Sequence, residues 1–206
     1  MLKAVLFDLD GTLVDTERLY LQANAAASAQ LGQPLPAAAF QRLVGTGDLR
    51  QNAWLQQQFG AGLEAFIRLS DELVEQQLGS VSALPGATQL LNHLHQRGIQ
   101  LGLVTVSPST YVNNIVTQQP WPQFDVTVTG DVGASKPAPD LYQRALSQLA
   151  LPTPAVVAVE DTPAGVTAAN AAGLRCLQVH DLAPASAKAT AVLPDLVAVA
   201  AWLRNA

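Results

Sequence analysis

The sequence has few of the residues that bind nucleic acids or crosslink a secreted protein. It contains one cysteine, Cys176, and only three lysines. A single cysteine excludes a disulfide framework within the chain, and its apolar surroundings predict a small core residue. There is no run of basic residues and the formal net charge is −5. These features argue against a nucleic acid or an anionic membrane surface as a partner.

Long apolar runs are also missing. The run Leu196–Leu203 is well below the roughly 18 residues that a membrane-spanning helix needs. The apolar run near the amino terminus is too short for a secretion signal. We therefore expect a cytoplasmic protein without membrane contact, and a monomer. The 206 residues, 49% of them hydrophobic, suffice for one substantial core, or for a core domain with a small insertion.

The beginning of the chain combines a short apolar run with two carboxylates. Ala4–Phe7 fits a strand buried on both faces, and Asp8, Asp10 and Gly11 follow it directly. Residues i and i+2 of a strand point to the same side, so both carboxylates can face one crevice. Such a pair calls for a cation, and oxygen ligands favour a hard ion such as Mg²⁺. A solvated Asp-Gly turn is the ordinary alternative for this stretch taken alone.

Two kinds of pattern divide the chain. Residues 14–83 have a helical pattern, with helices expected at 17–31, 37–44, 49–59 and 63–78. From residue 84 onward, strands expected at 99–105, 124–128, 155–159 and 174–179 alternate with helices. This alternation predicts a parallel sheet covered on both faces. The sequence therefore predicts an α/β protein. Its core is formed by residues 1–13 and 84–206, and a helical insertion of residues 14–83 interrupts it.

Polar residues end several of the predicted strands. In open α/β sheets, ligands bind beyond the carboxyl ends of the strands. Thr105 ends one strand, Glu160 and Asp161 end another, and Lys136 lies before a proline-rich helix start. Each has an ordinary explanation, as a strand end, a helix start or a solvated lysine. Taken together with Asp8, they suit a phosphoryl group and its metal ion.

Four short motifs occur along the chain in order. They are Asp8-Leu9-Asp10-Gly11-Thr12, Thr105, Lys136 and Glu160-Asp161. In these motifs and their spacing the sequence resembles the haloacid dehalogenase superfamily of phosphotransferases over essentially its whole length. Residues 7–17 and 136–140 are most similar to the subgroup of β-phosphoglucomutase, phosphoglycolate phosphatase and small sugar-phosphate phosphatases. The resemblance implies a doubly wound, Rossmann-like core with an inserted all-helical cap domain.

The resemblance also implies a mechanism. The protein would be a Mg²⁺-dependent phosphohydrolase of small phosphomonoesters, working through an aspartyl-phosphate. Asp8 would be the nucleophile, and Asp10 the general acid and then the general base. Mg²⁺ would be held by Asp8, the backbone carbonyl of Asp10 and Asp161. Glu160 would bind the metal directly or support its ligands.

The remaining motif residues would bind the substrate. Thr105 would hydrogen-bond a phosphoryl oxygen, and Lys136 would neutralise charge there and orient Asp8. Backbone amides after Asp8 and near Val106 would complete the phosphate cradle. The expected substrate-binding set is therefore Asp8, Thr105, Val106 and Lys136.

The cap departs from the mutase pattern. Tyr20 stands where mutases have a histidine, and Gly47 and Asp48 stand where they have a Ser-Arg pair. Arg50 is expected to be solvated, with contact to an anionic substrate as the alternative. These differences favour a phosphatase and leave a β-phosphoglucomutase-type phosphotransferase as the alternative. A phospho-acceptor module or a non-catalytic binding protein is the alternative from a different class, and the physiological substrate does not follow from the sequence.

Overall fold

The computed structural model describes residues 1–45, 49–179 and 182–204. The chain divides into two compact units, one of Met1–Asp15 with Ser82–Ala206 and one of Thr16–Val81. Assignment of the first unit as the catalytic core and the second as its cap is our proposal. Among the described helices, none is long and apolar enough to cross a membrane.

The first unit is built on a parallel sheet in which the described residues form six strands. The strands follow the order β3-β2-β1-β4-β5-β6, and every neighbouring pair is parallel. Every residue of β1 and β4 is buried, as their apolar residues predict, and Glu160 at the end of β4 is buried with them. The bounds are β1 Ala4–Phe7, β2 Gln100–Val104, β3 Val126–Val128, β4 Val156–Glu160, β5 Arg175–Val179 and β6 Ala191–Leu193.

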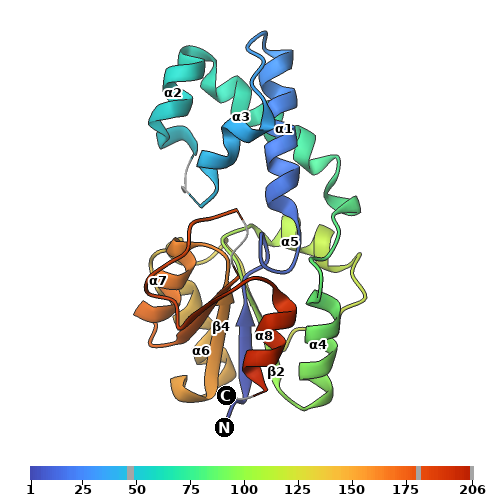
Figure 1. Ribbon diagram of the computed structural model, residues 1–206, viewed down its shortest axis with the longest axis vertical. Helices are drawn as coiled ribbons and strands as arrows, with labels where there is room; N and C mark the ends of the chain where they lie inside the picture. The colour runs from blue at the N-terminus through green and yellow to red at the C-terminus, as the bar shows by residue number, and fades with distance from the viewer. Residues whose placement is uncertain (46–48, 180–181, 205–206) are drawn as a thin grey trace. The chain divides into compact units, whose positions relative to one another are not determined.

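Helices cover both faces of this sheet (Figure 1). Helices α6 (Asp140–Leu149) and α7 (Pro163–Ala171) pack on one face against alternate residues of the strands, including Ala4 and Leu6 of β1. Helices α4 (Ala87–Gln96) and α8 (Leu196–Leu203) lie together on the other face, and α5 (Ser109–Val116) follows β2. The predicted doubly wound α/β fold is confirmed. Cys176 is fully buried in this core, as predicted.

Two elements of the first unit were not predicted from the sequence. Strand β6 is a three-residue strand at the edge of the sheet, and none of its residues is fully buried. Helix α8 is almost continuously apolar, so its sequence lacks the polar face that marks a helical period. Asp195 nevertheless starts this helix, because its side chain accepts a hydrogen bond of 2.8 Å from the Ala198 amide.

The second unit is helical, as predicted, although its middle differs from the prediction. Its α-helices are α1 (Thr16–Gln30), α2 (Ala53–Phe59) and α3 (Leu63–Glu75). The segment Ala37–Leu43 is a 3₁₀ helix, and the helix expected at 49–59 is broken at Asn52. The Asn52 side chain accepts hydrogen bonds from two amides of α2 and so starts that helix. Asp48, which precedes the helix expected at 49–59, lies outside the described residues.

A pair of glycine substitutions tests the packing of the sheet. A Cβ atom at Gly102 would lie 2.2 Å from Leu6 Cδ2 and 2.8 Å from Val126 Cγ1, whereas one at Gly62 would meet nothing within 4 Å. We predict that Gly102→Ala lowers the free energy of unfolding by about 1–3 kcal/mol through overpacking. Gly62→Ala should leave it unchanged or raise it by less than about 1 kcal/mol. Urea denaturation followed by circular dichroism measures both, and equal values for the two variants would contradict this packing.

Candidate active site

Four of the predicted site residues meet at the carboxyl edge of the sheet. Asp8 follows β1, Thr105 follows β2, and Glu160 and Asp161 lie at the end of β4. Because β1 lies between β2 and β4, these strand ends are adjacent. All four residues are buried. Buried polar groups are costly unless they are paired, so their partners define the chemistry of the site.

Lys136 joins two of these carboxylates. Its Nζ atom lies 2.5 Å from Asp8 Oδ1 and 2.6 Å from Glu160 Oε1, and it donates to the Val104 carbonyl at 2.9 Å. Burial alone would lower the pKa of Lys136, but Asp8 and Glu160 raise it above its ordinary value. Lys136 is therefore a fixed cation between the two acids and not the solvated lysine of the ordinary interpretation.

The same acids form a group that fits a metal ion. Asp8, Glu160 and Asp161 each offer a carboxylate oxygen, and these atoms all lie within 4.8 Å of one another. Burial raises the pKa of Asp8, Lys136 lowers it, and Glu160 and Asp10 raise it again. Lys136 supplies one positive charge, so three ionised carboxylates leave negative charge that a divalent ion would balance. An all-oxygen donor set suits Mg²⁺.

The Asp10 side chain lies outside that group of three. Its Oδ2 accepts a hydrogen bond of 2.7 Å from Ser107 Oγ, and its Oδ1 accepts one of 2.7 Å from the Tyr111 hydroxyl. The metal contact predicted for its backbone carbonyl stays a prediction. Sequence reasoning did not identify Ser107 or Tyr111 as site residues. Ser107 follows Thr105 by two positions at the end of β2, and that place was the available signal.

Glu160 is held by two residues that the sequence analysis also missed. The Tyr142 hydroxyl donates a hydrogen bond of 2.5 Å to Glu160 Oε1, and burial followed by the Glu160 charge raises the pKa of that hydroxyl. The tyrosine therefore stays protonated and can donate. Gly165 lies against the same carboxylate, since a Cβ atom there would lie 1.8 Å from Glu160 Oε2. Both contacts fix the orientation of Glu160.

The loops around Asp161 and Val106 are held by other contacts. The buried Gln178 side chain donates a hydrogen bond of 2.7 Å to the Asp161 carbonyl. Val106 is 46% exposed, and a Cβ atom at Gly130 would lie 1.9 Å from its carbonyl oxygen. Thr105 Oγ1 accepts a hydrogen bond of 3.1 Å from the Ser107 amide. These contacts position the loop predicted to bind phosphate.

The cap residues singled out by sequence lie in the second unit. Tyr20 is half-buried on α1. Arg50 forms an ion pair with Glu64 at 3.4 Å, and both side chains are mostly exposed, at 57% and 70%. An exposed pair of this kind contributes little to stability. Gly47 and Asp48 lie outside the described residues.

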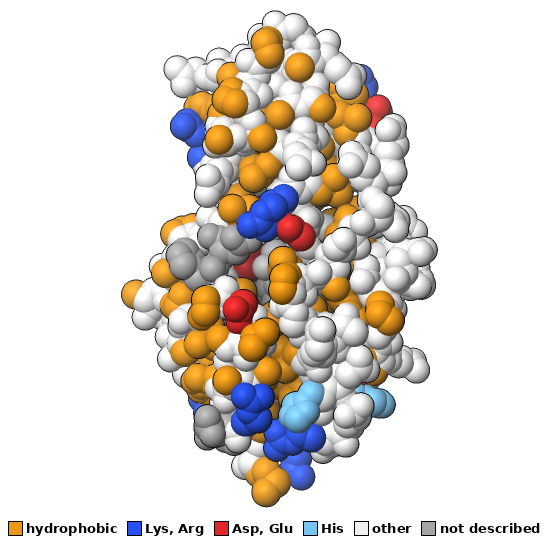
Figure 2. Space-filling model, turned by 45° about the vertical axis from the view of Figure 1, so that its right-hand side comes forward, with side chains coloured by type: hydrophobic (Ala, Val, Ile, Leu, Met, Phe, Trp, Pro, Cys, Tyr) orange, Lys and Arg blue, Asp and Glu red, His pale blue; other side chains and the backbone are white. Residues whose placement is uncertain are grey.

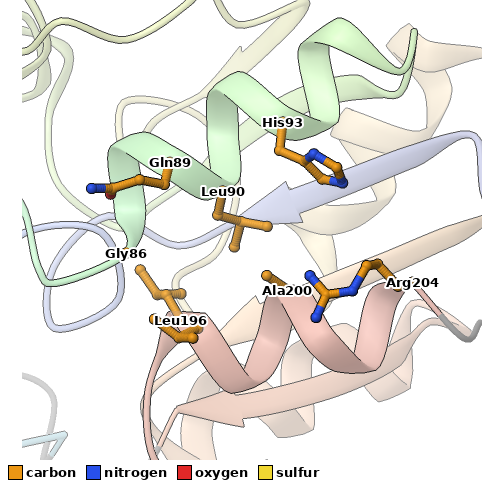
Figure 3. A pocket seen from close by; sticks show the side chains of 8 residues that line it. Gly86, Gln89, Leu90, His93, Leu196, Ala200 and Arg204 are labelled. Carbon is orange, nitrogen blue, oxygen red and sulfur yellow. The ribbon is translucent and has the colours of Figure 1, made fainter.

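One hollow in the first unit lies apart from the predicted site residues. It lies between α4 and α8, has a volume of about 470 Å³, and is lined mainly by apolar side chains with His93 and Arg204 at one end (Figure 3). None of the predicted site residues lines it. On the face shown in Figure 2, Lys and Arg side chains gather beside a histidine at the lower end, and the described residues form no continuous basic stripe along this face. The candidate active site is therefore the carboxyl edge of the sheet.

Gly165 allows a direct test of the metal site. We predict that Gly165→Ala displaces the Glu160 carboxylate and weakens Mg²⁺ binding by roughly tenfold or more, as measured by isothermal titration calorimetry. Gly79→Ala is the matched control, because a Cβ atom there would meet nothing within 4 Å. Unchanged Mg²⁺ affinity in folded Gly165→Ala protein would contradict this role of Glu160.

Comparison with known proteins places these residues in a family. The family model described as haloacid dehalogenase-like hydrolase matches residues 2–173. Over 213 residues the chain is 38% identical to the "Uncharacterized protein in fgs 3'region" of Lacticaseibacillus casei, covering 100% of this chain and 98% of the relative. It is 32% identical to the validoxylamine A 7'-phosphate phosphatase of Streptomyces hygroscopicus subsp. limoneus, covering 97% and 96% of the two chains.

A solved structure agrees with these sequence matches. The crystal structure of CbbY from Rhodobacter sphaeroides in complex with phosphate superposes with a TM-score of 0.78 at 28% identity. The match covers 95% of each chain. The likeness therefore extends over both the sheet and the helical insertion.

Proposed function

The chain belongs to the haloacid dehalogenase-like hydrolase family, and we propose that it is a Mg²⁺-dependent phosphatase of small phosphomonoesters that forms an aspartyl-phosphate. The family model and the relative named as a phosphatase support the hydrolase class that the sequence predicted. The observation that carries the mechanism is the Lys136 ammonium between Asp8 Oδ1 and Glu160 Oε1. It holds a buried carboxylate in one orientation at the edge where the phosphoryl group would bind.

The first step transfers the phosphoryl group to the enzyme. A carboxylate oxygen of Asp8 attacks phosphorus, and the bond between phosphorus and the leaving oxygen breaks. Asp10 gives its proton to that oxygen, so the product leaves as a neutral alcohol. Lys136 keeps Asp8 oriented for attack, and Thr105 with the backbone near Val106 donates hydrogen bonds to phosphoryl oxygens.

The second step hydrolyses the aspartyl-phosphate and regenerates the Asp8 carboxylate. Water attacks the phosphorus of the aspartyl-phosphate, Asp10 takes a proton from it, and the bond between Asp8 and phosphorus breaks to release phosphate. Mg²⁺, when held by Asp8 and Asp161 with Glu160, supplies positive charge that reduces the repulsion between an anionic nucleophile and an anionic phosphate. The buried carboxylates thus serve both steps.

The proposed substrates are sugar phosphates or esters of similar size. The relative from Streptomyces is named for a phosphate ester of this kind, and the resemblance to sugar-phosphate phosphatases points the same way.

The second unit is proposed to act as a cap that selects the leaving group. Arg50 is paired with Glu64, which favours the solvated arginine over an anion-binding one. The cytoplasmic location and monomeric state stay predictions.

A product assay separates the phosphatase from the mutase. A mutase must return the phosphoryl group to a sugar hydroxyl, and the residues that mutases use for this are replaced at Tyr20, Gly47 and Asp48. An aspartate in place of arginine reverses the charge that would grip the second phosphate of a bisphosphate intermediate. With β-glucose 1-phosphate and a trace of the 1,6-bisphosphate, we therefore predict free phosphate as the product. Rapid formation of glucose 6-phosphate with negligible phosphate release would establish the mutase.

A further inference from the structure

Both carboxylate oxygens of Asp10 accept a hydrogen bond from a hydroxyl group of the same unit. The Tyr111 hydroxyl donates to Oδ1 and Ser107 Oγ donates to Oδ2, each at 2.7 Å. The donors follow β2 in the chain, about a hundred positions from Asp10. Two bonds from different residues restrict the rotation of a carboxyl group that would otherwise turn freely about its side-chain bonds.

The backbone that carries these two hydroxyl groups is itself fixed. The Ser107 amide donates to Thr105 Oγ1 at 3.1 Å, and the Ser107 carbonyl accepts from the Gly130 amide at 2.9 Å. The Ser109 amide, at the start of α5, donates to Asp131 at 2.9 Å. The hydroxyl groups are therefore presented from a rigid loop and helix start.

We propose that Tyr111 is a positioning residue for the proton transfers of Asp10, with Ser107 acting on the other oxygen; this rests on the proposed phosphatase function. Proton transfer requires the carboxyl group to lie within hydrogen-bond reach of the leaving oxygen and later of the attacking water. A bond to Oδ1 keeps the carboxyl plane fixed while Oδ2 carries the proton. The Ser107 hydroxyl can keep donating to Oδ2 when that oxygen is protonated, because a protonated carboxyl oxygen still accepts a hydrogen bond, and the proton stays available for the leaving oxygen.

Helix α5 is attached to the core by apolar side chains other than Tyr111. Tyr111 is half-buried, whereas Val112 and Ile115 of the same helix are buried and attach it to the core. Replacing Tyr111 by phenylalanine keeps the ring and removes the oxygen that bonds Asp10. The variant should therefore fold like the wild type, with a melting temperature within a few degrees.

A positioning role makes a prediction that a structural role does not. A para-nitrophenolate group leaves readily without a proton, whereas a sugar alkoxide needs one from Asp10 as its bond to phosphorus breaks. The ratio kcat/KM reports only the steps up to formation of the aspartyl-phosphate. A poorly oriented Asp10 should therefore lower kcat/KM for a sugar phosphate much more than for para-nitrophenyl phosphate.

The test compares Tyr111→Phe with wild type on both esters. The sugar phosphate is the one that the wild type hydrolyses fastest in a panel. We predict that kcat/KM for the sugar phosphate falls by roughly tenfold or more, while that for para-nitrophenyl phosphate stays within about twofold. Thr110→Val is the control, because it removes an exposed hydroxyl from the same turn of α5 at nearly constant side-chain shape and should change neither ratio.

Each other outcome overturns the inference, and the outcomes separate it from the proposed function. An equal fall for both esters would assign Tyr111 to phosphate binding or to general stability. No fall for either ester would show that its hydroxyl does not orient Asp10. If the wild type hydrolyses neither ester, the proposed phosphatase function fails and this inference fails with it.

Discussion

The ammonium group of Lys136 between Asp8 and Glu160 is the interaction on which the site depends. Those two carboxylates and Asp161 are buried within one small volume, and burial raises the pKa of Asp8. Lys136 offsets part of this cost and sets the direction of Asp8. One lysine does not balance the negative charge of three carboxylates. The same residues therefore suit a divalent ion, which would neutralise the negative charge that Lys136 leaves.

The sheet makes this arrangement possible. With β1 between β2 and β4, the residues that follow three adjacent strands meet at one edge, at the point where the strand order reverses. Contacts of individual residues support the site as well as the order of the strands. Tyr142 and Gly165 fix the Glu160 carboxylate, while Ser107 and Tyr111 fix Asp10. The reacting groups are thus held before any substrate binds, which lowers the reorganisation that the reaction requires.

The sequence predicted the parts of this structure that local pattern encodes. Apolar runs located β1 and β4, and the proline-rich stretch after Lys136 marked the start of α6. Asp8, Thr105 and the Glu160-Asp161 pair were found because they end strands, and Lys136 because it precedes a proline-rich helix start. Tyr111 and Tyr142 were missed because their roles depend on contacts with residues far away in the chain, which no local period records. Helix α8 was missed because its apolar sequence has no polar face.

The most direct test of the central claim is the metal dependence of phosphate-ester hydrolysis. Purified protein is assayed with para-nitrophenyl phosphate in Mg²⁺, after treatment with EDTA, and after Mg²⁺ is restored. The Asp8→Asn variant serves as the blank that excludes a contaminating phosphatase. The account predicts that EDTA abolishes turnover, that Mg²⁺ restores it, and that the variant is inactive in every condition. Full turnover in metal-free buffer, or comparable turnover by Asp8→Asn, would contradict it.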